Sequence, residues 1–287
     1  MAMPIDPKTI TVFLDASPSG KRRVAQSAAF AQRWGAHIVG VHVVHNGVAP
    51  HPSMAYARSP KGIAGAIAHE RRLDDACECT TAEIGEHFQT LCDGLKVSSE
   101  FRPIPRGKTA ETAIINSLHS DLLVIGHPSP SGLPDEVSAV KIMLASGVPL
   151  LIVPNEWKGE TIGERIMIGW NASPEARRAV SDAMSFLVAA TSVTALVVDP
   201  AGCKWLGESV GCDISQHLGR HGARVEVEQV ASRGRPIAEV ILDRAMQSAS
   251  DLLVVGARSP AHLKEILLGN ATRTLLTKMP VPVLISR

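Results

Sequence analysis

The sequence predicts an α/β protein with two tandem five-stranded, mainly parallel open sheets flanked by helices. The main observation is a repeat: Asp121-Leu-Leu-Val-Ile-Gly126 recurs as Asp251-Leu-Leu-Val-Val-Gly256, and each copy precedes a second matching run, Val148-Pro-Leu-Leu-Ile152 and Val281-Pro-Val-Leu-Ile285. These runs are short, continuous and aliphatic and alternate with helical segments, which is typical of parallel strands covered on both faces. The two copies start at Asp121 and Asp251, and such a long repeat indicates tandem domains, because solenoids and propellers repeat every 20–50 residues, roughly.

The length of 287 residues is enough for about two domains. We place the first at residues 1–155 and the second at 163–287, with the boundary in the polar connector 154–163. In the first domain, Ser17 or Ser19 is expected to cap the first helix and Gly35 to close it. The expected strands are 9–14, 38–44, 98–104, 122–125 and 149–153, and the expected helices are 21–34, 63–95, 109–118 and 136–145.

The second domain repeats this order of elements. Ser173 is the expected N-cap of its first helix, and Pro236 stands where its third helix begins, a favoured position for proline. The expected strands are 166–170, 193–198, 225–231, 252–255 and 281–286, and the expected helices are 174–189, 214–221, 237–248 and 264–278.

Composition narrows the classes of function. With 29 basic and 28 acidic side chains, the formal charge is +1, so no concentrated basic face for nucleic acid is expected. Hydrophobic residues make up 45% of the chain and aromatic residues 3%, so the cores must be aliphatic. No apolar run approaches the roughly 18 residues of a membrane span, and the N-terminus lacks the pattern of a secretory signal. We therefore expect a cytoplasmic protein without membrane contact, whose five cysteines are reduced and hold no metal.

Candidate ligand residues follow from the rule that open parallel sheets bind ligands beyond the carboxyl ends of their strands. Gly256 lets the chain leave a strand tightly, and Gly269 lacks a Cβ where an anion could approach the amides of a helix start. Asn270 and Thr272 add side-chain donors. An ordinary strand-to-helix turn with a packing glycine is the alternative. The candidate nucleotide-binding residues are Asn171, Val197, Gly256, Ala257, Arg258, Ser259, Gly269, Asn270, Ala271 and Thr272.

The spacing of this stretch resembles the signature of the universal stress protein family. Gly256-x-x-Ser259, nine residues, Gly269-Asn270 and then a terminal Pro-Val strand is similar to the family pattern Gly-x-x-Gly, nine residues, Gly and Ser or Thr. An Asp or Asn with a Ser two residues later ends the first strand of each domain. The resemblance covers nearly the whole chain as two consecutive domains, and implies the adenine nucleotide α-hydrolase-like fold with, in one branch of the family, bound ATP.

The resemblance also implies roles for individual residues. Asn171 and Val197 would hold the adenine and ribose end, while Gly256, Ser259, Gly269 and Asn270 would hold the phosphates. Ser259 replaces a family glycine, and Asn270 replaces a hydroxyl residue.

The first domain departs further from the family pattern. Asp15, Val43 and Gly126 match it, but Ala139-Val140 stands where Gly and Ser or Thr belong, and Pro128, Pro130 and Pro134 remove amide donors from the loop. We interpret this first site as degenerate. Because the family commonly pairs its last strands, Leu150–Val153 and Val283–Ser286 are the expected contact edges of an internal pseudo-dimer, and a homodimer is the further assembly considered.

Three functional hypotheses remain open. The first is a cytoplasmic stress-response protein whose second domain binds ATP or AMP, with Mg²⁺ accompanying ATP, as a sensor or regulator without catalytic residues. The second is a protein-interaction scaffold that binds no nucleotide and works through unknown protein partners. The third is a slow ATP hydrolase, which would need Asp199 or another carboxylate to position Mg²⁺.

Overall fold

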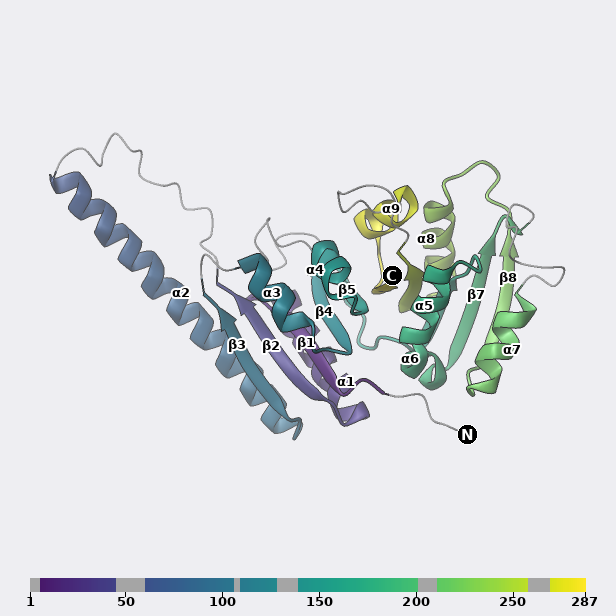
Figure 1. The fold of residues 1–287 in the computed structure, drawn as a ribbon, viewed down its shortest axis with the longest axis horizontal. Helices are drawn as coiled ribbons and strands as arrows, with labels where there is room; N and C mark the ends of the chain where they lie inside the picture. The colour runs from purple at the N-terminus through teal and green to yellow at the C-terminus, as the bar shows by residue number, and fades with distance from the viewer. Residues whose placement is uncertain (1–5, 45–59, 106–108, 128–138, 201–210, 258–268) are drawn as a thin grey trace.

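The computed structural model of this chain has an α/β fold with one mostly parallel ten-stranded sheet flanked by helices (Figure 1). It describes residues 6–44, 60–105, 109–127, 139–200, 211–257 and 269–287. The strand order is β3-β2-β1-β4-β5-β10-β9-β6-β7-β8. We call β1 to β5 with their helices the N-terminal half, and β6 to β10 with theirs the C-terminal half.

The N-terminal half follows the predicted order of elements. Ser17 caps the first helix by accepting a hydrogen bond from the amide of Gly20 at 2.9 Å, and Gly35 ends that helix with a φ of 59°. The long second helix is continuous through Thr80, whose hydroxyl donates to the carbonyl of Ala76 at 2.9 Å. The elements are β1 (Thr9–Leu14), α1 (Pro18–Trp34), β2 (His37–Val43), α2 (Pro60–Gly94), β3 (Ser99–Ile104), α3 (Thr109–Ser117), β4 (Leu122–His127), α4 (Ala139–Ser146) and β5 (Leu150–Pro154).

The C-terminal half contains the same succession with one additional helix. Ser173 caps its first helix as expected, accepting from the amide of Ala176 at 3.2 Å. The elements are β6 (Arg165–Gly169), α5 (Pro174–Asp182), α6 (Met184–Ala189), β7 (Ser192–Val198), α7 (Cys212–Arg220), β8 (Val225–Val230), α8 (Ile237–Gln247), β9 (Leu252–Gly256), α9 (Asn270–Lys278) and β10 (Val283–Ser286).

The single helix predicted over residues 174–189 is wrong, because the chain bends at Ala183 and forms α5 and α6. The bend directs Phe186 of α6 onto two aromatic rings of α1. Its ring centroid lies 5.2 Å from that of Phe30 and 4.8 Å from that of Trp34, both edge-on. Neither glycine nor proline marks the bend, so a tertiary contact between the two halves accounts for it.

The two halves join through their last strands. β5 and β10 pair antiparallel, with Leu284 opposite Leu151, so the contact edges expected from the sequence do meet. Within each half the neighbouring strands are parallel. The two expected sheets are thus continuous with each other.

Two hydrophobic cores lie on opposite faces of the sheet, and each extends through both halves. One core packs under α1, α2, α5, α6 and α7, and the other under α3, α4, α8 and α9. Both are built almost wholly from aliphatic side chains, as the composition predicts. Across the residues described, no helix combines the length and apolar character that crossing a bilayer requires.

Candidate functional site

The topology places the candidate site at the edge where β6 and β9 lie side by side. From β6 the chain proceeds outward through β7 to β8, and then returns to form β9 and β10 on the other side. The order of strands therefore reverses between β6 and β9, which is where open α/β sheets bind ligands. The segments to examine are those that follow β6, β7 and β9.

After β6, Asn171 is exposed and organises the start of α5. Its side-chain oxygen accepts a hydrogen bond from the amide of Ser173 at 3.1 Å, and Ser173 then caps the helix. Asp15 does the same after β1, accepting from the amide of Ser17 at 2.8 Å. The matching acid-or-amide and serine pairs therefore have a local structural purpose in both halves.

After β7, the side chain of Val197 is fully buried, so only its backbone is available to a ligand. Asp199 follows, and its carboxylate accepts a hydrogen bond from the amide of Ser232 at 2.7 Å. Hydrogen bonds from the Ser232 hydroxyl and amide lower the pKa of Asp199. Asp199 thus holds the loop after β8, and that carboxylate is already engaged rather than directed at a metal ion.

Backbone strain gathers in the same loops of the C-terminal half. Among the described residues other than glycine, five have positive φ, and three of these are Ala172 at 54°, Asp199 at 51° and Arg233 at 53°. They follow β6, β7 and β8 respectively. Non-glycine residues in this region cost energy and are found preferentially at functional sites. The sequence did not indicate positive φ at these three positions, although it had suggested Asp199 as a possible Mg²⁺ ligand.

After β9, the lack of a side chain at Gly256 has a packing explanation. A Cβ there would lie 2.4 Å from the backbone carbon of Glu175 and 2.5 Å from the amide nitrogen of Ala176. The glycine therefore lets the first turn of α5 approach the end of β9. Ala257 is fully buried, and its amide donates to the carbonyl of Ser286 at 2.7 Å. Arg258 and Ser259 lie outside the described residues.

Gly269 is the residue directly before α9, with φ −59° and ψ 150°. Of the helix predicted over residues 264–278, α9 forms the part from Asn270 to Lys278, after an extended Gly269, and residues 264–268 lie outside the described residues. Asn270 and Ala271 are exposed at this helix start. Thr272, expected as a side-chain donor, is only 5% exposed, so its hydroxyl faces the protein interior rather than solvent.

In the N-terminal half, a buried arginine occupies the equivalent edge. Arg23 of α1 is 1% exposed and forms an ion pair with Asp15. A Cβ at Gly126 would lie 2.2 Å from Nη1 of Arg23. The cavity beside Asp15 measures about 80 Å³, well below the roughly 300 Å³ at which ligand pockets begin. The sequence had singled out Gly126 and Asp15 but had missed Arg23.

Pro128, Pro130 and Pro134 lie outside the described residues. His127, at the end of β4, is partly buried, and this burial lowers its pKa.

The described part of the chain contains no cluster of side chains suited to bind a metal ion. No group of three or more His, Cys, Asp or Glu side chains that could hold an ion occurs there. Among the described residues, Cys77, Cys79, Cys92 and Cys212 form no disulfide bond, and burial raises the pKa of Cys92.

Comparison with known proteins identifies the fold. The model of the universal stress protein family matches residues 163–287. A universal stress protein from Archaeoglobus fulgidus is 16% identical and aligns over 99% of this chain and 97% of its own, with a TM-score of 0.69. A functionally unknown protein from Pseudomonas aeruginosa is 14% identical over 98% of this chain and 92% of its own, with a TM-score of 0.58.

A universal stress protein in complex with cAMP also matches, at 18% identity over 53% of this chain and 99% of its own, with a TM-score of 0.31. No curated protein sequence matches this chain. The two alignments that span nearly the whole chain show the fold of both halves, whereas the family model covers residues 163–287, which is less than half of the chain. Residues 163–287 therefore match the universal stress protein family, and the chain as a whole has the fold of the solved universal stress protein from Archaeoglobus fulgidus.

Proposed function

We propose that this protein binds an adenine nucleotide, ATP or AMP, in a C-terminal domain at residues 163–287 and acts as a cytoplasmic stress-response sensor or regulator. The domain at residues 1–155 serves as its structural partner. Asn171 and the backbone of Val197 contact the adenosine part, while Gly256 to Ser259 and Gly269 to Thr272 surround the phosphates. Mg²⁺, where present, enters with ATP on its phosphate oxygens.

The start of α9 is the observation that carries this proposal. Its N-cap is Gly269, which has no side chain to accept a hydrogen bond from the first amides of the helix. Within the described residues, the amides of Asn270, Ala271 and Thr272 donate no hydrogen bond to a described acceptor. The amides in the first turn of a helix, together with the helix dipole, favour a phosphate group.

The strained loops after β6, β7 and β8 support the same edge. Ala172, Asp199 and Arg233 have left-handed conformations, and the carboxylate of Asp199 accepts a hydrogen bond from the amide of Ser232. Such strain is consistent with a preorganised binding edge. Arg233 is exposed at this edge and can approach a phosphate.

Calorimetric titration of the full chain with ATP, AMP and GTP tests the proposal. We expect the adenine nucleotides to bind and GTP to bind more weakly. Gly269→Glu should abolish binding, because it adds bulk and negative charge at the helix start, while a φ of −59° accommodates any L residue. Gly94→Glu is the matched control, because a Cβ there meets no atom within 4 Å and the position lies in the other half.

A scaffold that binds no nucleotide is the second candidate, and one observation favours it. Gly256 is required by the approach of α5, so this glycine alone is no sign of a phosphate. Absence of heat and of a thermal shift at millimolar ATP and AMP would select the scaffold. Equal ATP binding by the wild type and Gly269→Glu would instead place the nucleotide elsewhere on the protein.

A further inference from the structure

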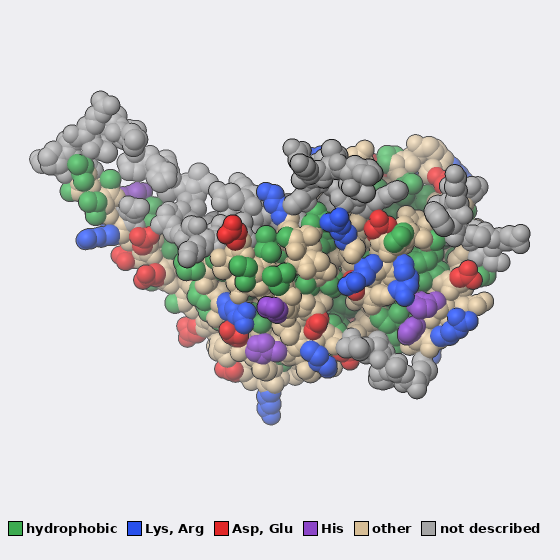
Figure 2. Space-filling view, in the orientation of Figure 1, with side chains coloured by type: hydrophobic (Ala, Val, Ile, Leu, Met, Phe, Trp, Pro, Cys, Tyr) green, Lys and Arg blue, Asp and Glu red, His purple; other side chains and the backbone are tan. Residues whose placement is uncertain are grey.

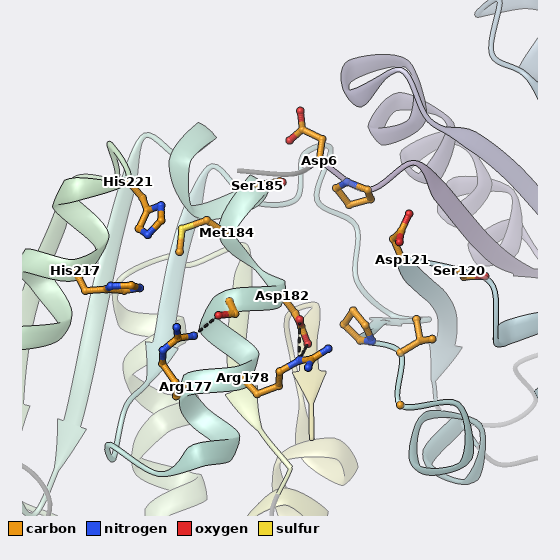
Figure 3. A pocket seen from close by; sticks show the side chains of 15 residues that line it. Asp6, Ser120, Asp121, Arg177, Arg178, Asp182, Met184, Ser185, His217 and His221 are labelled. Carbon is orange, nitrogen blue, oxygen red and sulfur yellow. Dashed lines mark hydrogen bonds and ion pairs between the residues drawn. The ribbon is translucent and has the colours of Figure 1, made fainter. Parts of the chain in front are cut away.

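A cleft of about 610 Å³ lies between the two halves and shares no residue with the proposed nucleotide edge. One wall consists of α5, α6 and α7, and the other of the turns that precede β1, β4 and β5 (Figure 3). The volume falls in the range of small-molecule sites, roughly 300–1,000 Å³. α5 buries Ala176, Ala179 and Val180, while Arg177, Arg178 and Ser181 line the cleft.

Basic side chains from two helices converge in this cleft. Arg177 of α5 and His217 of α7 extend toward each other, and His221 lies beside them (Figure 3). The two imidazole rings are 4.9 Å apart between centroids. Arg177 donates to the hydroxyl of Ser181, and none of the three basic residues joins an ion pair with a described carboxylate. Figure 2 shows Lys, Arg and His side chains gathered over this part of the molecule.

The position of Arg177 calls for a counter-ion. It is the fourth residue of α5, near the helix N-terminus, where the dipole disfavours cations. The adjacent Arg178 is compensated by Asp182, with 2.9 Å between Nε and the carboxylate. On α7, His217 lies in the last turn, where a cation is favourable. Among these three residues, Arg177 has neither a described carboxylate partner nor a position in its helix that favours a cation.

Acidic groups across the cleft leave this charge uncancelled. The carboxylate of Asp121 accepts hydrogen bonds from the amides of Lys8 at 2.8 Å and Thr9 at 2.9 Å. Asp182 is paired with Arg178. Asp6 remains on the wall opposite the basic residues (Figure 3), where it can accept a hydrogen bond from a hydroxyl group.

We propose that this cleft binds a small phosphate monoester, with its phosphate held by Arg177, His217 and His221 and its hydroxyl-bearing body directed toward Asp6. Three donor side chains from two helices suit a tetrahedral oxyanion, whereas a planar carboxylate would be satisfied by the guanidinium alone. The ligand would contact both halves at once and would favour their present arrangement. This site is independent of the proposed nucleotide edge, and a ligand here would act as a second signal.

The surrounding charges give the site a pH dependence. His217 lies near Arg177 and near the ion pair between Arg178 and Asp182, all on α5. The charged or titratable residues close to it in sequence are Asp213, Arg220 and His221. Across the cleft lie Asp6 and Asp121. Burial and the neighbouring positive charges lower the pKa of His217. A bound phosphate reverses the sign of the local field and favours the protonated imidazole of His217, so phosphate binding should raise the pKa of His217.

Titration of the full chain with inorganic phosphate, at constant ionic strength set with chloride, tests the proposal. The imidazole NMR signals of His217 and His221 report binding directly. We expect saturable shifts that Arg177→Gln weakens by about tenfold or more, since it removes charge-assisted hydrogen bonds. Arg178→Gln is the matched control, with the same charge change on the next residue, and should weaken binding by less than about threefold because Arg178 is already paired.

Two outcomes would overturn the proposal: shifts that do not saturate, or equal weakening by both arginine variants, which would indicate charge screening only. Succinate binding as tightly as phosphate would overturn the assignment to phosphate monoesters. Measuring ATP binding by the same variants distinguishes the cleft from the proposed nucleotide edge. Arg177→Gln should retain it and Gly269→Glu should retain phosphate binding, so the two sites can fail independently.

Discussion

Arg23 and Asp15 form an ion pair buried between α1 and the end of β1, next to Gly126. The guanidinium of Arg23 also donates from Nε and Nη2 to the carbonyl of Phe13, at 3.3 Å each. Burial lowers the pKa of Arg23, while the charge of Asp15 opposes that effect. The matching glycine of the C-terminal half, Gly256, adjoins the backbone of α5 instead. Both glycines therefore make room for the first helix of their own half.

Removing one member of this pair should destabilise the protein strongly. Arg23→Met leaves the Asp15 carboxylate, whose side chain is 10% exposed, without its counter-charge, and we expect a loss of about 3–5 kcal/mol in the free energy of unfolding. The double variant Asp15→Asn with Arg23→Met should recover at least half of that loss, because Asn171 already performs the same turn in the other half. Urea denaturation measures both, and a double variant less stable than Arg23→Met would contradict the account.

Gly256→Ala tests whether close packing, rather than a ligand, requires this glycine. The new Cβ would lie 2.4 Å from a backbone atom of α5, which cannot move aside cheaply, so we expect a loss of about 2 kcal/mol or more. Gly219→Ala is the control, because a Cβ on this residue of α7 meets nothing within 4 Å and alanine favours helix. Equal stability of Gly256→Ala and the wild type in urea would contradict the packing explanation.

The sequence predicted the fold well because strand order and helix caps have local signatures. Buried aliphatic runs, Ser17, Gly35 and Ser173 each act within a few residues, and the structure confirms all of them. The bend at Ala183 could not be predicted, because its cause is a contact of Phe186 with rings more than 150 residues earlier in the chain.

Glycines were the least decisive part of the site prediction. A glycine that admits a phosphate and a glycine that admits a neighbouring helix look alike in sequence, since both only report a missing side chain. The spacing around Gly256 pointed to the first reading, and the contact with Glu175 supports the second. Arg23 could have been noticed by aligning the two halves, where a charged residue stands opposite Ala179 on the buried face of the first helix.

The pKa of His217 should lie below the 6.5 of an ordinary histidine, and Arg177→Gln should raise it. Below 6.5 the unfolded chain binds a proton at this residue more readily than the folded chain does. The contribution of His217 to the free energy of unfolding is therefore retained at neutral pH and lost as the pH falls from about 6.5 through the folded pKa. NMR titration of His217 in both proteins measures this, and an unchanged pKa in Arg177→Gln would show that the two side chains do not interact.

Leu151 and Leu284 should couple the stabilities of the two halves. They lie opposite each other where β5 meets β10, and both are fully buried. Each substitution to alanine should cost about 2–5 kcal/mol, and the double variant should differ from the sum by at least about 0.5 kcal/mol because the residues are direct neighbours. Leu123, which is fully buried in the core on the other face of the sheet, provides the control pair with Leu284. Its double variant should be additive, and equal additivity for the Leu151 pair would show that these two side chains do not couple the halves.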